Sequence, residues 1–449
     1  MFDDTPGDDT PATSTVAPGA GERGRPMRSD RTMRRGWRVA VLGAVVALGA
    51  AACNADDIDP IAETDTDALS GTIEVWGMGA EGEAMSVLAD MFMDEYPDVT
   101  VNVTPVAWDV AHDRLVTSVA GGLMPDVTQL GTTWMGEFAL RDALDPTPET
   151  IDAGSFYEGA WDTTVVEGTS YGVPWYVETR LLYYRTDLAE DAGWTEPPAD
   201  WDELKQMAAD LQEAGSQNGI SLGLGQGSWQ NFLPFVWSNG GQVVDDNDEF
   251  TLDEPPVVEA LEFYASFFAE GLTSPQPEGF DITPAFVQGT FPMFFSGPWH
   301  MALIEETGGE EIEGNWTVAH MPQRDSATSF VGGSNLVVSQ DTENRDAAWA
   351  FVEFLSRPDV QSTWYQEVGA LPSVPEAWES GELAEDEHLA LFGEQLQDAQ
   401  APPAIPSWEE VAAAIDDQIE RAAFGVVDAD EAAGTMQSNA ESIGTGLER

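Results

Sequence analysis

The sequence predicts an α/β protein of two lobes, and three observations support this fold class. Strand-like and helix-like patterns alternate from residue 72 onward, as expected for a sheet covered by helices. The hydrophobic fraction of 42% and the aromatic fraction of 10% can supply a large core, so the high charge does not indicate disorder. About 380 residues follow the leader and linker described below, a length that favours two lobes over one.

The first part of the folded region contains repeated β-loop-α units. Residues 72–76 alternate as a strand, 77–82 form a glycine-rich turn, and 83–96 have apolar residues at helical spacing. The pattern then repeats, with strands predicted at 99–106 and 125–130 and helices at 110–120 and 133–140. In such a sheet the ligand loops lie at the carboxyl ends of the strands.

The second lobe is expected to begin after residues 172–185, a long extended stretch with almost no turn signal. Its length suits a strand that crosses from one lobe to the other. Three helices with start signals follow: one capped by Asp200, one with Pro256 in its first turn, and one preceded by the capping-box pair Ser407 and Glu410.

Residues 1–52 are predicted to be a lipoprotein-type signal peptide with a long charged n-region, and 53–70 a flexible tether. Cys53 is the only cysteine, and it follows an apolar run, 39–52, that is shorter than the roughly 20 residues of a spanning helix. Residues 50–53 resemble a lipobox without its usual leucine, so Cys53 is the expected lipidation site. The alternative is a buried free thiol behind an ordinary secretory signal. Arg34 and Arg35 also resemble a twin-arginine export signal, so the export route stays open between the general secretory and twin-arginine pathways.

Removal of this leader leaves ten cations against 75 anions, a net charge of −65 over 397 residues. Such a surface repels nucleic acid and anionic lipid head groups, which excludes polyanion binding. Self-repulsion at this charge also favours a salt-rich medium, so we interpret the composition as that of an acidic halophilic protein.

Eleven short segments in fixed order carry a resemblance to a known family. The mature chain resembles the family 1 extracellular solute-binding proteins of bacterial sugar ABC transporters, relatives of maltose-binding protein. The segments are residues 72–79, 92–97, 120–127, 131–134, 172–175, 184–187, 198–204, 295–299, 331–336, 347–351 and 369–372.

This resemblance implies a two-lobed periplasmic-binding-protein-like fold with a crossover-strand hinge and a ligand cleft between the lobes. The expected boundaries are 71–178 and 333–370 for lobe 1, and 179–332 and 371–449 for lobe 2. It further implies an extracytoplasmic monomer, anchored to the cell membrane only through Cys53, that closes over a sugar and delivers it to the permease subunits of an ABC transporter.

The residue chemistry is compatible with a sugar site, because sugar rings have apolar C–H faces and a girdle of hydroxyls. Such a ligand needs aromatic walls with carboxylates and amides as hydrogen-bond partners. The candidates are tryptophans in loop-like or glycine-rich surroundings, an acidic residue after the first strand, polar residues on the predicted crossover strand, and a glycine-rich return strand that also suits a hinge. They are Trp76, Glu81, Trp134, Trp175, Tyr176, Glu178, Trp229, Trp237, Trp299, Gly332, Gly333 and Ser334. For each tryptophan the alternative is a core position, and Arg180 and Arg185 are expected to pair with neighbouring acids.

Other functions receive less support from the sequence. No catalytic, metal-binding or cofactor motif is present, and the four histidines are scattered without ligand spacing, so we predict neither an enzyme nor a cofactor. Anionic solutes need clusters of basic residues that this chain lacks. A polyamine suits an acidic cleft and is the strongest alternative ligand class.

Overall fold

A computed structural model describes residues 69–245, 247–277 and 279–447. The predicted leader, Cys53 and the tether up to residue 68 lie outside these residues. In the described part of the chain, none of the helices has the length and apolar character needed to cross a bilayer.

The first lobe is built on a seven-stranded sheet in the order β11-β6-β10-β3-β1-β2, with β12 also paired to β10. Strands β2 and β3 run parallel to β1, whereas β10 is antiparallel to both β3 and β6. The bounds are β1 Gly71–Met78, β2 Val99–Val106, β3 Val127–Gly131, β6 Val173–Thr179, β10 Ser329–Val338, β11 Leu371–Pro372 and β12 Ala399–Gln400. The strands predicted at 72–76, 99–106 and 125–130 are thereby confirmed.

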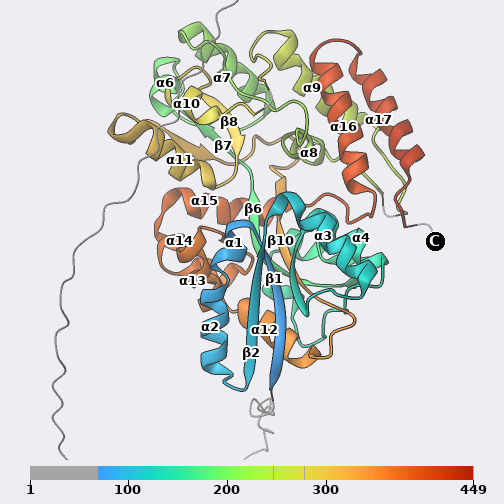
Figure 1. Cartoon of the computed structure of the whole chain (residues 1–449). Helices are drawn as coiled ribbons and strands as arrows, with labels where there is room; N and C mark the ends of the chain where they lie inside the picture. Colours follow the sequence, from blue (N-terminus) through green and yellow to red (C-terminus); the bar gives the residue numbers. More distant parts are fainter. Residues whose placement is uncertain (1–68, 246, 278, 448–449) are drawn as a thin grey trace, which may run out of the picture. The chain divides into compact units, whose positions relative to one another are not determined.

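Helices cover both faces of this sheet (Figure 1). Ile73 and Val75 of β1 pack with α2 and α12 on one face, while Leu130 of β3 packs with α3 and α4 on the other. The helices are α1 Gly79–Ala84, α2 Ser86–Glu95, α3 Trp108–Gly121, α4 Met135–Leu140, α5 Glu158–Asp162, α12 Arg345–Leu355 and α13 Pro358–Val368. A hairpin of β4 (Val165–Val166) and β5 (Thr169–Ser170) lies beside α4.

The glycine-rich turn predicted at 77–82 is wrong, because helix α1 already begins at Gly79. A Cβ atom on Gly82 would lie only 2.2 Å from the carbonyl oxygen of Gly77. These glycines therefore let α1 pack directly against the end of β1, which a search for turn residues does not detect.

The second lobe is built on a smaller sheet in the order β8-β7-β9. Its strands are β7 Leu181–Tyr184, β8 Met293–Ser296 and β9 Thr317–Ala319. Its helices are α6 Thr186–Asp191, α7 Trp201–Ala214, α8 Trp229–Ser238, α9 Pro255–Ala269, α10 Ile282–Val287, α11 Trp299–Gly308, α16 Trp408–Ala423 and α17 Ala429–Ile443. The C-terminal helices α16 and α17 share a core with α7, α8 and α9 (Figure 1).

Two of the predicted helix starts are confirmed, and the third is wrong in its capping detail. The Asp200 carboxylate accepts from the amide of Glu203 at 2.9 Å, and Pro255 and Pro256 stand in the first turn of α9. Ser407 precedes α16, but its hydroxyl donates to the carbonyl of Gly444 at 2.6 Å instead of capping the helix. Ser407 thus ties α16 to the chain beyond α17.

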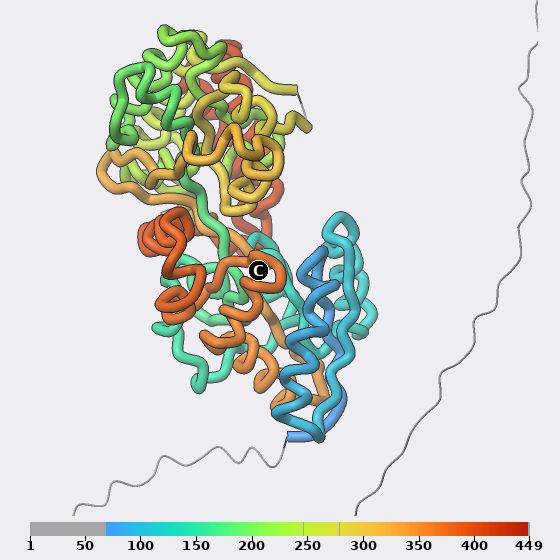
Figure 2. Tube along the Cα trace, turned by 90° about the vertical axis from the view of Figure 1, so that its left-hand side faces the viewer, coloured from blue at the N-terminus to red at the C-terminus, as the bar shows by residue number. Residues whose placement is uncertain are grey.

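The two sheets are connected by extended segments (Figure 2). The predicted crossing at 172–185 is confirmed, because β6 belongs to the larger sheet, β7 to the smaller one, and Arg180 is the only residue between them. The return segment passes from β9 to β10. Residues 371–400 contact both sheets. Their strands β11 and β12 pair with the larger sheet. Their helices are α14 (Glu382–Glu385) and α15 (Glu387–Gln395), and Phe392 of α15 lies against Tyr183 of the smaller sheet. The lobe boundary at residue 371 therefore stays a prediction.

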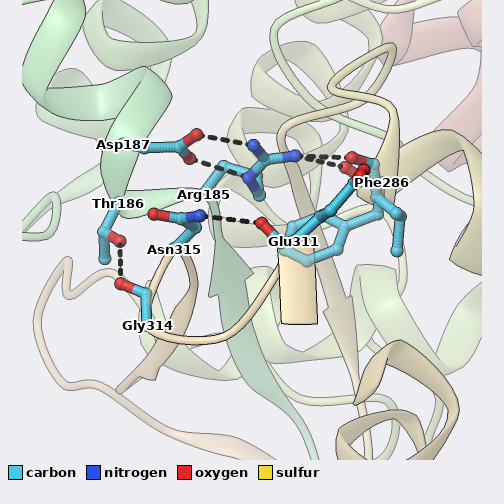
Figure 3. A network of polar contacts seen from close by, with 8 residues as sticks. Arg185, Thr186, Asp187, Phe286, Glu311, Gly314 and Asn315 are labelled. Carbon is cyan, nitrogen blue, oxygen red and sulfur yellow. Dashed lines mark hydrogen bonds and ion pairs between the residues drawn. The ribbon is translucent and has the colours of Figure 1, made fainter. Parts of the chain in front are cut away.

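Arg185 fixes the end of β7 inside the second lobe (Figure 3). Its guanidinium donates to both carboxylate oxygens of Asp187 at 2.7 and 2.6 Å, and to the carbonyl oxygens of Phe286 and Val287 at 3.3 and 2.7 Å. Because these donors are occupied within the fold, Arg185 is a structural cation, as the sequence predicts.

Candidate functional site

Two cavities meet at the strands that connect the sheets. The first, which we call the hinge cavity, has a volume of about 220 Å³. The second, the side cavity, has a volume of about 560 Å³ and shares Tyr176 and Glu178 with the first. The hinge cavity is lined by Trp108, Gly131, Thr132, Thr133, Trp134, Tyr176, Glu178, Trp229, Gln230, Phe330, Gly332 and Gly333.

Strand pleating explains why Tyr176 and Glu178 point the same way. Side chains two residues apart on a strand lie on one face, so both reach the cavities from β6. Burial, together with the nearby carboxylates of Glu81 and Glu178, raises the pKa of the Tyr176 phenol above its ordinary value. Its hydroxyl consequently stays protonated and can donate a hydrogen bond beside a carboxylate that accepts one.

Gly332 and Gly333 stand opposite these residues on β10, where Gly332 pairs with Glu178 and Gly333 with Val177. Gly333 has a φ of +121°, and a Cβ atom there would lie 2.2 Å from the carbonyl oxygen of Tyr176. A Cβ atom on Gly332 would lie 2.5 Å from the ring of Phe330. Gly333 is thus required by its backbone conformation and by the Tyr176 carbonyl, whereas Gly332 leaves space for the ring of Phe330, and both glycines line the hinge cavity.

Aromatic rings from both lobes form the walls of the hinge cavity. In the first lobe, Trp108 and Trp134 meet edge to face at 5.6 Å between centroids. In the second lobe, Trp229 lies edge to face against Phe330 at 5.5 Å and against Trp408 of α16 at 5.0 Å. A flat ligand face can therefore contact indole rings from either lobe.

Trp229 and Gln230 are positioned by a carboxylate from far along the chain. Asp416 of α16 is buried, and it accepts from the amide of Gly227 at 2.7 Å and from the Ser228 hydroxyl and the Trp229 amide at 2.8 Å each. Burial raises the pKa of the Asp416 carboxyl above its ordinary value. Asp416 thus satisfies donors at the first turn of α8, which carries the second-lobe wall of the hinge cavity.

Trp299 begins α11, lines the side cavity and is 43% exposed. The guanidinium carbon of Arg180 lies 5.0 Å from its ring centroid and 4.9 Å from that of Phe330. Arg180 is buried; it donates to Gln230 Oε1 at 2.7 Å and lies 3.5 Å from Glu178 Oε1. The expected pairing of Arg180 with a neighbouring acid is therefore a long contact to Glu178. The shorter hydrogen bond of Arg180, to Gln230, links the crossover to α8.

The side cavity is acidic. Its lining includes Glu81, Glu178, Glu305, Glu382 and Asp386 besides Trp299. Glu81 reaches it from α1, so α1, β6 and α11 all contribute to this cavity.

The structure does not place every predicted residue at these cavities. Trp175 is 1% exposed and stacks on Trp364 at 4.9 Å, and Trp237 is buried in the second-lobe core. Ser334 is fully buried, and Trp76 lies outside both linings under the guanidinium of Arg114, 4.1 Å from its ring centroid. We therefore leave these four residues out of the proposed site.

Sequence reasoning missed Trp108, Arg180, Gln230 and Phe330 as site residues. Trp108 lies two residues after the predicted strand 99–106, and a ligand loop is expected at the carboxyl end of such a strand. Gln230 adjoins Trp229, which the sequence did select, so proximity was an available signal. Phe330 lies on the return strand, where sequence reasoning selected only Gly332, Gly333 and Ser334. Among the described residues, no group of three or more His, Cys, Asp or Glu side chains is arranged to hold a metal ion.

Comparison with known proteins establishes the family of the chain. Residues 87–391 match the family model described as bacterial extracellular solute-binding protein. A binding protein of Brucella abortus (strain 2308) is 30% identical over 332 residues, covering 72% of this chain and 80% of that protein. The solved structure of the sugar-binding protein MalE from the phytopathogen Xanthomonas citri is 30% identical, with a TM-score of 0.79 over 83% of this chain and 97% of that one.

The maltotriose-binding protein of Pyrococcus abyssi (strain GE5 / Orsay) is 26% identical and covers 78% of this chain and 77% of its own length. The chain therefore belongs to the bacterial extracellular solute-binding proteins, and its fold is the two-lobed one that the sequence predicts. These relatives are binding proteins and not enzymes, in agreement with the prediction of a non-catalytic chain.

Proposed function

We propose that this chain captures a mono- or oligosaccharide between its lobes and delivers it to the permease subunits of an ABC transporter. The observation that supports a sugar is the composition of the hinge cavity. The aromatic rings of Trp108, Trp134, Trp229 and Phe330 line it together with the polar side chains of Tyr176, Glu178 and Gln230. Stacking on the C–H faces of a sugar and hydrogen bonding to its hydroxyls need this combination. The named sugar-binding relatives support the same ligand class.

Delivery requires a conformational signal, which we propose is lobe closure about β6, β10 and Arg180. Ligand contacts from both lobes would favour the closed state over the open one. Small-angle scattering with and without saturating ligand measures the closure, and an unchanged radius of gyration would contradict it.

We further propose that the protein is a monomer held at the extracytoplasmic face of the cell membrane by lipid on Cys53. Replacement of Cys53 by Ala is expected to move the protein from the membrane fraction to the soluble one.

The acidic side cavity favours a polyamine as the second candidate ligand. Five carboxylates and no Lys or Arg line it, which suits a polycation. Affinity for a polycation falls with added salt because the interaction is screened, whereas stacking and neutral hydrogen bonds are little affected.

Purified residues 54–449 in high salt test the proposal. Tryptophan emission and the melting temperature are recorded against mono- and oligosaccharides, with spermidine and glycerol 3-phosphate as controls. A sugar that changes the emission and raises the melting temperature supports the proposal. A response to spermidine alone would replace the sugar by a polyamine.

A further inference from the structure

The first-lobe wall of the hinge cavity is built from tryptophans of two different segments. Trp108 is the first residue of α3, and Trp134 ends the 3₁₀ helix η2 (Thr132–Trp134) that leads into α4. A Cβ atom on Gly131 would lie 3.3 Å from the Trp134 indole, so this ring rests on the backbone at the end of β3. Trp134 is only partly buried and lines the cavity. Its orientation therefore depends on the side chains beside it.

His112 is a neighbour of Trp134 that lies outside the cavity lining. It follows Trp108 by one turn of α3, so the two side chains lie on the same face of this helix. The ring centroids of His112 and Trp134 are 5.1 Å apart at an interplanar angle of 70°, an edge-to-face contact like that between Trp108 and Trp134. A further edge-to-face contact, at 5.9 Å, joins the imidazole to Phe138 of α4. The imidazole thus contacts the wall from outside the cavity.

A carboxylate of α4, the helix beside α3 (Figure 1), fixes the His112 ring. Oε2 of Glu137 lies 2.8 Å from Nε2 of His112, and Oε1 of the same carboxylate accepts from Arg141 at 2.7 Å. An ionised carboxylate only accepts hydrogen bonds, so Nε2 of His112 carries the proton. Because both oxygens of Glu137 are occupied, the carboxylate holds the imidazole in one tautomer and one orientation.

The neighbours of Trp134 are both held in place. A Cβ atom on Gly79 would lie 2.6 Å from Cδ1 of Trp108, so the Trp108 ring packs directly on the start of α1. His112 is held by its hydrogen bond to Glu137. An indole that lies against two fixed rings is preorganised, and less side-chain entropy is lost when a ligand stacks on it.

The second-lobe wall of the hinge cavity has a comparable arrangement. There Asp416 accepts from the amide of Trp229 at 2.8 Å and lies outside the cavity lining, as Glu137 does in the first lobe. In each lobe a carboxylate outside the lining therefore holds the segment or ring that supports the aromatic wall.

We propose that His112 is a positioning residue for ligand binding: anchored by Glu137, it holds the Trp134 indole in the orientation that stacks on the ligand. This inference rests on the proposed sugar binding, because stacking on a sugar face is what requires a fixed indole. It assigns a role in binding to two side chains that line neither the hinge cavity nor the side cavity.

A double-mutant cycle with residues 54–449 tests this role. Tryptophan emission is titrated with maltotriose and with the sugar panel described above, and melting temperatures verify folding. Loss of one aromatic pair corresponds to a fall of about 2- to 12-fold in affinity. His112→Ala and Glu137→Ala are expected to cause such a fall in the wild-type background and no further fall in a Trp134→Ala background. Asp113→Ala, at the next and exposed residue of α3, is the matched control.

A second measurement needs no sugar. In protein labelled with 5-fluorotryptophan, the ¹⁹F NMR line of Trp134 is assigned by its absence in Trp134→Phe. His112→Ala is expected to shift and broaden this line, because the indole then samples other orientations, whereas Asp113→Ala is expected to leave it unchanged.

The two measurements separate the failure of the positioning role from the failure of the proposed function. An unchanged Trp134 line in His112→Ala, or an equal loss of affinity with and without Trp134, would overturn the positioning role and reduce the contacts of His112 to a tie between α3 and α4. Silence of the wild-type protein toward every sugar would contradict the proposed sugar binding, while the NMR line still reports whether His112 holds the Trp134 ring.

Discussion

Replacement of Asp416 by Asn tests whether the C-terminal helix α16 builds the second-lobe wall of the ligand site. The wild-type carboxylate accepts three hydrogen bonds, two at Oδ1 from Ser228 and Trp229 and one at Oδ2 from Gly227. The Asn carbonyl can keep the pair at Oδ1, but its NH₂ group then faces the amide of Gly227. One charge-assisted hydrogen bond is lost and a donor is left unpaired, which is expected to cost about 2–4 kcal/mol of unfolding free energy.

The same substitution is expected to weaken sugar binding, because the first turn of α8 carries Trp229 and Gln230. Urea titration in high salt gives the unfolding free energy, and tryptophan emission gives the affinity. Asp417→Asn is the matched control, since Asp417 is the next residue of the same helix and is exposed. If Asp416→Asn and Asp417→Asn have equal stability and equal affinity, the positioning argument is refuted.

Three further substitutions test other parts of the site. Trp299→Ala is expected to lower sugar affinity by about 1–3 kcal/mol through lost stacking, measured by emission titration; unchanged affinity would remove Trp299 from the site. Burial lowers the His300 pKa to about 4, so the stability that its neutral form contributes is present above about pH 6.5 and is lost as the pH falls through about 4. The stability advantage of the wild type over His300→Gln should therefore shrink by about 1–3 kcal/mol between pH 7 and 4, whereas a constant difference in urea titrations would contradict this. Gly333→Ala should cost more than about 2 kcal/mol because of its positive φ and the nearby Tyr176 carbonyl; Gly434→Ala, in a helix with open space, is the control, and equal melting temperatures would disprove the steric argument.

Local patterns in the sequence were sufficient for most of the fold. Alternation and helical spacing predicted β1, β2, α7 and α9, because these elements bury one face against a nearby partner. The absence of turn signals in 172–185 predicted the crossing between the sheets. The turn expected at 77–82 was wrong because the same glycines that permit a turn also permit the close contact of α1 with β1.

The candidate site was less predictable, since it depends on contacts between residues far apart in the chain. Tyr176, Glu178, Gly332 and Gly333 were selected because they lie on the strands that connect the lobes, and the structure brings them together. No local signal separates a cavity tryptophan such as Trp229 from a core tryptophan of similar surroundings. That distinction arises from partners nearly 190 positions away: Trp175 stacks on Trp364, whereas Trp229 is held at the cavity by Asp416.

In the proposed mechanism, a ligand bound at the connecting strands acts directly on lobe closure. Glu178 lies on β6, Arg180 is the residue between β6 and β7, and Phe330 lies on β10. Arg180 binds Gln230 and lies beside the rings of Phe330 and Trp299, so the second-lobe aromatic groups are coupled to the crossover by one buried cation. A ligand that orders Gln230 and Trp299 therefore acts on the same guanidinium that any rotation of the lobes must move. The proposed closure then needs no separate pathway between ligand and hinge, because Arg180 of the crossover directly contacts the proposed ligand-binding residues Gln230 and Trp299.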